Sequence, residues 1–155
     1  MAKQILVQKG SEHPYFHKDF HILLNEAIAY LNRTYGAQAV RAYLTRFAAA
    51  WYKPLKDSIQ KKGLDAVQAH YERIYQLEGA RYKLHRTRDS LTLQLEASPA
   101  VLHIRASGHP VSEQFFETVA TVNRVICQGT PVACELLAYS EENGGYRLRF
   151  FGRMP

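Results

Sequence analysis

The hydrophobic period changes once along this chain of 155 residues, and that change constrains the fold more than any other feature. From residue 13 to residue 77, apolar side chains recur every three or four residues, which is the period of helices with one buried face. Further along, they alternate with polar residues, which is typical of half-buried strands; examples are Tyr82, Leu84, Leu91, Leu93 and Leu95. A helical half followed by a half that contains strands predicts an α+β fold.

Four helical segments are expected in the first half, over residues 13–35, 37–52, 55–63 and 64–77. The first begins near His13-Pro14, because proline suits the first helical position. Gly36 and Gly79 are expected to end helices, and Pro54 to break or kink the chain. The apolar stripes are expected to be buried, with Leu23, Tyr43, Trp51 and Leu77 among their members.

Two β-hairpins are expected in the second half. One joins residues 81–86 to 90–97, and the other joins 132–139 to 146–151 through a turn that contains Asn143-Gly144. Between them, helices are expected over 99–107 and 112–128. The sequence therefore predicts a single domain, with a polar lead-in (1–12), a helical half (13–78) and a ββααββ half (79–151). Its N-terminal helices would pack on a four-stranded antiparallel sheet, with a helical segment inserted between the hairpins.

The composition excludes several classes of protein. No stretch approaches the roughly 18 apolar residues of a transmembrane helix, and the N-terminus lacks a signal-peptide core. Two cysteines make no disulfide framework, so we expect reduced thiols and a cytoplasmic location. The net charge of +6 favours anionic partners, but the basic residues are scattered. A solvated surface explains them best, followed by a small anionic ligand and then by nucleic acid.

Three histidines near the N-terminus are spaced by four residues. His13, His17 and His21 would share one helix face, where His17 and His21 are candidates to bind one metal ion. Asp19 would then orient an imidazole. The alternative is an ordinary polar helix face with half-exposed imidazoles.

The turn before residue 99 is a second candidate site. Ser98 precedes Pro99 at a helix start, where backbone N–H groups stabilise anions, and His103 follows one turn later. No Gly-x-Ser-x-Gly elbow surrounds Ser98, which argues against a conventional serine hydrolase. A helix-capping serine explains the same residues.

The helix expected over 112–128 carries polar residues at helical spacing. Glu117, Thr121 and Arg124 share one side, and Asn123 is four residues before Cys127. Such a set offers a base, an orienting group and a nucleophile. Core packing is the alternative account of Cys127 and of Cys134.

Several short motifs together resemble the L-2-amino-thiazoline-4-carboxylic acid hydrolase-like family. They are the run from His13 to His21, the segment Tyr35–Val40 with Tyr43-Leu44, the turn Ser98–Ala100, and the segment Val122–Thr130. The resemblance spans roughly residues 13–151. It implies a hydrolase that opens a cyclic amidine carboxylate with water.

The resemblance also implies roles for particular residues. Glu117 or His103 would supply acid–base catalysis, Cys127 would be the nucleophile, and Ser98 would supply a hydroxyl to the catalytic site. Arg105 or Arg124 would hold the substrate carboxylate, with Thr121 and Asn123 completing the binding site.

A non-catalytic binding or sensor domain is the competing hypothesis. The order of elements is similar to that of small-molecule-binding domains of the vinyl-reductase type. An apolar pocket lined by some of the ten Tyr and seven Phe would bind a lipid, a tetrapyrrole or an aromatic metabolite. Any cofactor is left open, although a histidine would ligate a haem. Nucleic-acid binding is a third hypothesis, to which the alternating run Tyr146–Phe150 lends a faint signal. A homodimer is expected on frequency alone.

Overall fold

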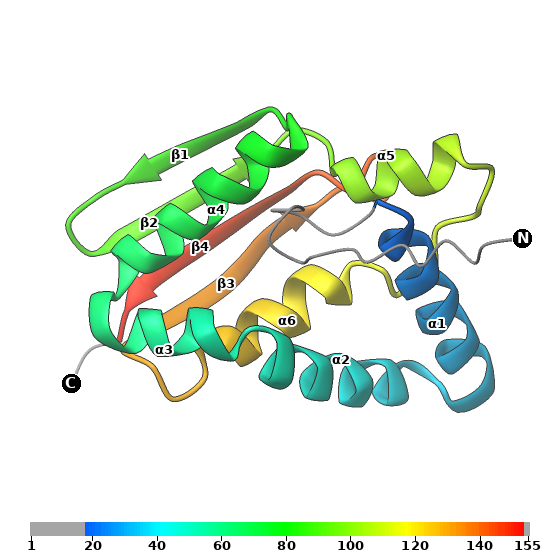
Figure 1. Cartoon of the computed structure of the whole chain (residues 1–155), viewed down its shortest axis with the longest axis horizontal. Helices are drawn as coiled ribbons and strands as arrows, with labels where there is room; N and C mark the ends of the chain where they lie inside the picture. The colour runs from blue at the N-terminus through cyan, green and yellow to red at the C-terminus, as the bar shows by residue number, and fades with distance from the viewer. Residues whose placement is uncertain (1–17, 154–155) are drawn as a thin grey trace, which may run out of the picture.

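The chain folds into helices packed on a four-stranded antiparallel sheet, which confirms the expected α+β class (Figure 1). The computed structural model describes residues 18–153. Its elements are α1 (Asp19–Tyr35), α2 (Ala37–Trp51), α3 (Lys53–Lys62), α4 (Leu64–Glu78), β1 (Tyr82–Arg86), β2 (Ser90–Leu95), α5 (Pro99–Ala106), α6 (Glu117–Cys127), β3 (Val132–Tyr139) and β4 (Tyr146–Gly152).

The strand order is β1-β2-β4-β3, so β4 lies between β2 and β3 and joins the two hairpins into one sheet. Leu93 is the central residue of the seam that joins them, since it pairs with Leu84 on β1 and with Leu148 on β4. The second hairpin contains an irregularity between Leu136 and Ala138, which shifts the pairing of β3 by one residue.

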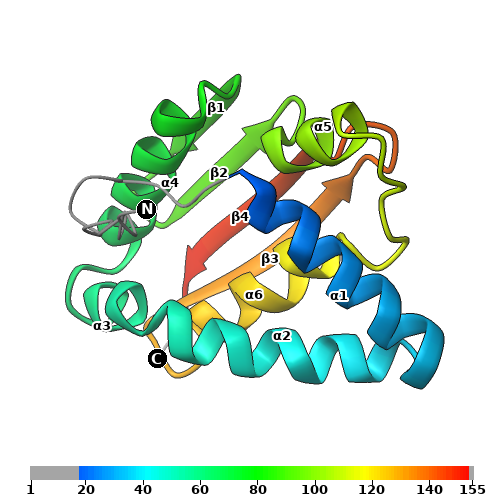
Figure 2. The same cartoon turned by 45° about the vertical axis from the view of Figure 1, so that its right-hand side comes forward.

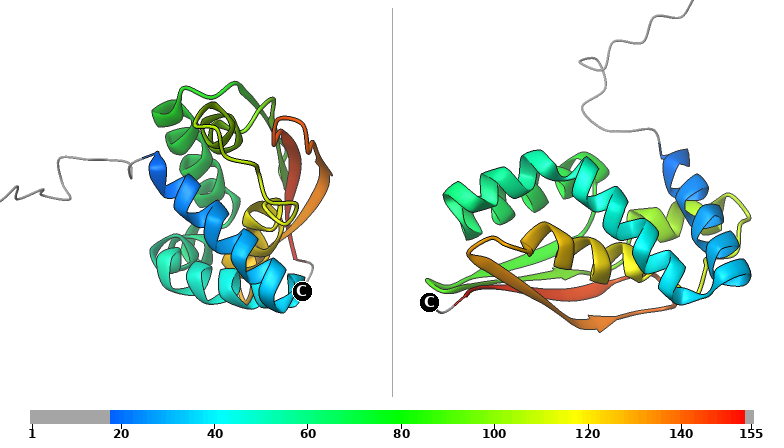
Figure 3. Two further views of the ribbon diagram at one scale, coloured as in Figure 1. Left: turned by 90° about the vertical axis from the view of Figure 1, so that its right-hand side faces the viewer. Right: turned by 90° about the horizontal axis from the view of Figure 1, so that it is seen from below.

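All the helices lie on the same face of the sheet (Figure 3, right). Helix α4 contacts β2 and β4, and α6 contacts β3. Helix α2 packs on α6, while α1 lies between α2 and α5 (Figure 2). The opposite face of the sheet carries no helix in the described part of the chain.

The core lies between the sheet and this helical layer. Its largest fully buried side chains come from both halves of the chain: Ile28, Val40, Leu44, Ile59, Val67, Leu91, Leu93, Val101, Ile104, Val132, Leu148 and Phe150. The polar residues of the central strands point the other way, because side chains alternate along a strand.

Most expected boundaries are confirmed to within a residue or two, but one prediction is wrong. The break expected at Pro54 is confirmed, since α2 ends at Trp51 and α3 begins at Lys53; Pro54 occupies the first turn of α3, where its missing N–H removes no hydrogen bond. The helix expected over 112–128 is shorter, because residues 113–116 form turns and α6 begins at Glu117. The start expected at His13 lies outside the described residues.

Four residues expected on buried stripes are exposed instead. They are Leu23, Tyr43, Trp51 and Leu77, with Trp51 exposing 56% of its surface. Each lies at the margin of its stripe, where helical periodicity does not separate a core position from a flanking one.

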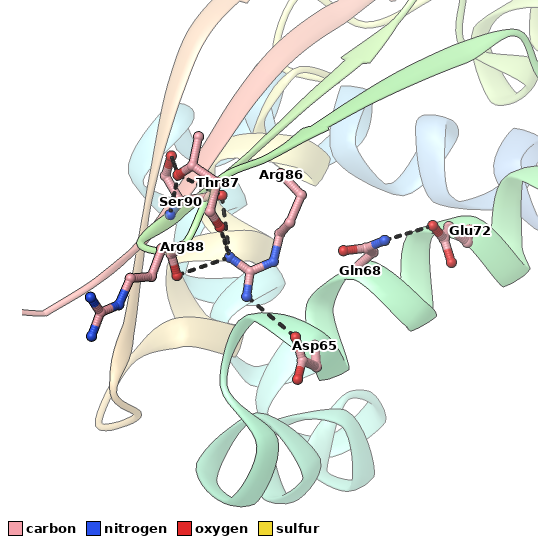
Figure 4. Close-up of polar contacts among 7 residues, drawn as sticks. All are labelled: Asp65, Gln68, Glu72, Arg86, Thr87, Arg88 and Ser90. Atoms are coloured by element: carbon pink, nitrogen blue, oxygen red, sulfur yellow. Dashed lines mark hydrogen bonds and ion pairs between the residues drawn. The ribbon is translucent and has the colours of Figure 1, made fainter.

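The turn of the first hairpin is fastened to α4 by one guanidinium (Figure 4). Arg86 Nη1 donates to the carbonyl oxygens of Thr87 and Arg88, and Arg86 Nη2 lies 3.3 Å from Asp65 Oδ1. Arg86 thus satisfies turn carbonyls while it pairs with the helical layer.

The turn of the second hairpin packs against the start of α5. Gly144 has a positive φ of 68°, and a Cβ added there would lie 2.4 Å from Val101 Cγ2. Ser98 N donates to the Asn143 carbonyl oxygen. The Asn-Gly turn predicted from the sequence therefore holds the N-terminal end of α5 in place.

No helix in residues 18–153 combines the length and apolar character needed to cross a membrane.

Candidate functional site

A cleft of about 150 Å³ opens among α1, α2, α5 and α6. Most of its lining is apolar, and five side chains offer polar atoms. The lining residues are Phe20, His21, Leu24, Phe47, Trp51, Tyr52, Ser98, Ala100, Phe115, Thr118 and Val122. An apolar cavity of this size accommodates a single aromatic ring.

Three aromatic rings form one wall of the cleft. Phe20, Phe47 and Trp51 have ring centroids 6.1–6.4 Å apart and interplanar angles of 15–28°. Phe47 and Trp51 are four residues apart on α2, and Phe20 faces them from the first turn of α1. Rings in this arrangement suit a flat ligand, because offset stacking and edge-to-face contacts are both favourable aromatic geometries.

His21 places a neutral imidazole in the cleft. Burial lowers the pKa of His21 to about 4, and nearby His103 contributes to the same shift. His21 Nε2 is 4.0 Å from Glu78 Oε1, and the two side chains are only 13% and 9% exposed. At neutral pH this imidazole is uncharged, with one donor and one acceptor nitrogen.

Apart from the indole N–H of Trp51, the other polar groups of the lining are hydroxyls. Ser98 caps α5, where its Oγ accepts a hydrogen bond from Val101 N at 3.4 Å, so its own proton remains available to donate. Thr118 Oγ1 donates to the Phe115 carbonyl oxygen. Burial and the carboxylate of Glu78 raise the pKa of Tyr52, which keeps that phenol protonated.

A histidine–carboxylate pair joins the start of α1 to α5. His103 Nε2 lies 2.9 Å from Asp19 Oδ1, with the histidine side chain 27% exposed and the aspartate 61%. Asp19 was expected to orient an imidazole, and it contacts His103. The pair lies close enough to His21 for His103 to influence its pKa.

Glu117, Thr121 and Arg124 form a connected set, as their spacing predicts, but they are absent from the lining of the cleft. Thr121 Oγ1 donates to Glu117 Oε2 at 2.5 Å, and Arg124 Nη2 donates to Thr121 Oγ1 at 2.9 Å. Arg41 on α2 completes the set with an ion pair of 3.2 Å to Glu117 Oε1. This network connects α6 to α2.

The remaining candidates are dispersed. Asn123 Oδ1 accepts a hydrogen bond from the Tyr71 hydroxyl at 2.5 Å, beneath α4. Arg105 Nη2 donates to the Glu141 carbonyl oxygen in the second hairpin turn. Cys127 is buried beside Cys134, and burial and this neighbour both raise its pKa, which disfavours the thiolate.

The structure thus brings Ser98, His103 and His21 to one region and leaves the other candidates elsewhere. His17 lies outside the described residues. Within residues 18–153, no group of three or more His, Cys, Asp or Glu side chains is arranged to hold a metal ion.

Sequence reasoning missed the aromatic wall, because Phe20, Phe47 and Trp51 recur with the period that is typical of a buried helix face. The sequence does contain one signal that Trp51 is not a core residue. Trp51 is the last residue of α2, and a large ring at a helix terminus has fewer neighbours to cover it than one in the middle of a helix.

No model of a known protein family matches the chain, and a search of curated proteins also returns no match.

Proposed function

We propose that this protein is a small-molecule-binding domain and that its ligand occupies the cleft walled by Phe20, Phe47 and Trp51. The observation that supports this function best is the combination, in one cleft of about 150 Å³, of three nearly parallel rings with a neutral imidazole. An apolar lining with a few polar groups is the usual composition of such sites.

The ligand we propose is an uncharged molecule with a single planar ring. Its face would lie against the aromatic wall, and one polar substituent would reach His21, Tyr52 or Ser98. Among the described residues that line the cleft there is no Lys or Arg, so this region supplies no cation for the anionic ligand expected from composition.

The single tryptophan of the chain makes binding directly measurable. We expect 4-methylphenol or benzamide to shift the Trp51 indole N–H resonance in a two-dimensional NMR titration, and benzoate to shift it less. Both uncharged probes leaving this resonance unmoved would contradict the proposal.

Two alanines of α5 provide matched variants. Ala100 lines the cleft, whereas Ala106 is exposed at the end of the same helix. Ala100→Leu should fill the space and weaken probe binding at least tenfold, and Ala106→Leu should leave it unchanged. Equal affinities in the two variants would place the probe outside the cleft.

The hydrolase function is a second proposal, favoured by one observation. The His103–Asp19 pair and Ser98 belong to the region of the cleft, and a histidine oriented by a carboxylate is a general base when it lies near a hydroxyl. Purified protein incubated with 2-amino-thiazoline-4-carboxylate would then release a free thiol. Turnover that survives in both Ser98→Ala and His103→Ala would eliminate these residues as the catalytic ones.

A further inference from the structure

The face of the sheet that carries no helix is basic. Its exposed side chains include Lys83 and His85 on β1, Gln94 on β2, Arg147 and Arg149 on β4, and Glu135 on β3. We call this surface the open face. Figure 3 (right) shows it as the side of the sheet turned away from the helices.

The pairing register sets these side chains in two rows across the strands. Lys83 pairs with Gln94, which pairs with Arg147; His85 pairs with Thr92, which pairs with Arg149. Neighbouring strands are about 4.8 Å apart and residues two apart on one strand are about 7 Å apart, so the backbone positions of the three cations lie within roughly 12 Å of one another.

The cations of the open face have few partners on the protein. Glu135 lies opposite Arg149 in the register, yet no ion pair within 4.0 Å joins either Arg147 or Arg149 to a carboxylate in residues 18–153. Arg86, by contrast, faces the helical layer and pairs with Asp65 (Figure 4). The charge of the open face is therefore available to an external anion.

One guanidinium also forms a flat platform. Arg149 lies over the ring of Phe151, with 5.6 Å between its Cζ and the ring centroid. Tyr146 and Phe150, the aromatics of the alternating run seen in the sequence, point into the core. The stacking surface on this strand is thus supplied by Arg149 and Phe151.

We propose that the open face binds single-stranded nucleic acid, with Lys83, Arg147 and Arg149 contacting phosphates and the Arg149–Phe151 platform stacking on a base. Charge complementarity selects a polyanion. The flat platform, together with the amide of Gln94 and the hydroxyl of Thr92, favours nucleic acid over an acidic polypeptide, which offers no rings to stack on. This site is separate from the cleft, which lies within the helical layer on the other side of the sheet.

The test is a fluorescence-anisotropy titration of the full chain with a labelled 12-nucleotide RNA of mixed sequence, at several salt concentrations. Three phosphate contacts predict a slope of about −2 for the logarithm of the binding constant against that of salt. The double variant R147Q/R149Q should bind at least tenfold more weakly, with a slope near −0.7. R147K/R149K should keep most of the slope, since the charges remain.

The matched control is R46Q/R73Q, which removes the same charge from exposed positions of α2 and α4. It should retain nearly all the affinity. Circular dichroism verifies that each variant is folded, and R147K/R149K replaces R147Q/R149Q if the latter is not. In that case the lysine variant should keep the salt slope and bind severalfold more weakly, because it loses the guanidinium platform.

Three results would overturn the proposal. The first is the absence of RNA binding. The second is an equal loss of RNA affinity in R46Q/R73Q, which would indicate a general effect of net charge. The third is equally tight binding of a labelled polyglutamate peptide, which would identify a protein-binding surface.

Discussion

Glu117 shows how a residue with the chemistry of a catalyst can instead connect two helices. Its two carboxylate oxygens are both engaged, one by Arg41 and the other by Thr121. Because Arg41 is 43% exposed, solvent screens part of this pair, and its contribution to stability is that of a partly buried ion pair.

Glu117→Gln is therefore expected to lower the free energy of unfolding by about 1–2 kcal/mol and to leave probe binding in the cleft unchanged. Urea denaturation measures the first quantity, and the Trp51 resonance reports the second. A large loss of probe binding without a loss of stability would place Glu117 in the ligand site after all.

His70 makes stability depend on pH. It packs edge-on against the rings of Tyr52 and Tyr71, and burial lowers its pKa from 6.5 to about 4. Between these two values the unfolded chain binds a proton that the folded chain excludes, so acid favours unfolding.

We expect this one histidine to cost roughly 3 kcal/mol of stability between pH 7 and pH 4. His70→Gln should flatten the decline by that amount in urea denaturation followed against pH. His85→Gln on the exposed side of β1 is the control for the substitution itself. Parallel pH curves for wild type and His70→Gln would contradict the assignment.

The second hairpin turn depends on the absence of a side chain at one position. A Cβ at Gly144 would meet Val101 and Ser98 at 2.4–2.9 Å, and the residue also has a positive φ. Gly129 has a similar φ of 72° but open space around it. Comparing an alanine substitution at Gly144 with one at Gly129 therefore distinguishes the effect of a steric clash from the effect of backbone strain.

Gly144→Ala is expected to destabilise the fold by roughly 3 kcal/mol, and Gly129→Ala by only about 1 kcal/mol. Thermal unfolding of the two variants measures the difference. Because the turn supports the start of α5, Gly144→Ala should also weaken probe binding in the cleft. Equal destabilisation in the two variants would show that strain alone matters there.

Glycines at helix ends made the helical half predictable. Gly36, Gly63 and Gly79 end or separate the helices as expected, because each adopts a positive φ that other residues avoid. Pro54 indicated the boundary between α2 and α3, but not its own place in the first turn of α3. A proline can interrupt a helix or begin one, and its position in the sequence does not distinguish the two until the neighbouring helices are known.

The cleft could not be derived from the sequence to the same degree. Ser98 and His21 were identified individually, but their proximity depends on how α1 packs against α5, a contact between segments nearly 80 residues apart. The polar set on α6 was equally visible in the sequence, yet its partner Arg41 comes from α2. The spacing of polar residues along the sequence identifies those that share one face of a helix. It does not indicate which other helix supplies their partners.

At the scale of the molecule, the sheet has a protected centre and two exposed edges. The buried residues of β2 and β4 include Leu91, Leu93, Leu148 and Phe150, each 1% exposed or less. Both strands are paired on both sides, whereas β1 and β3 each have one neighbouring strand within residues 18–153.

Backbone amides of β2 and β4 should therefore exchange with deuterium most slowly. Within the sheet, the outward-facing amides of β1 and β3 should exchange fastest. Among the helices, the amides of α1 should exchange faster than those of α6. Hydrogen exchange followed by NMR tests this order. Protection that is highest in β1 would mean that this edge is covered in solution.

The order β1-β2-β4-β3 also has a consequence for assembly. Strand β4 follows β3 in the chain yet pairs with β2, so the residues that precede the second hairpin leave one edge of β2 unpaired. The hairpin over residues 132–152 is a contiguous piece that completes the sheet from outside. We therefore expect two fragments to reassemble when mixed: a chain that ends before residue 130, and a separate peptide that carries this hairpin. Each fragment could then be used to detect the other.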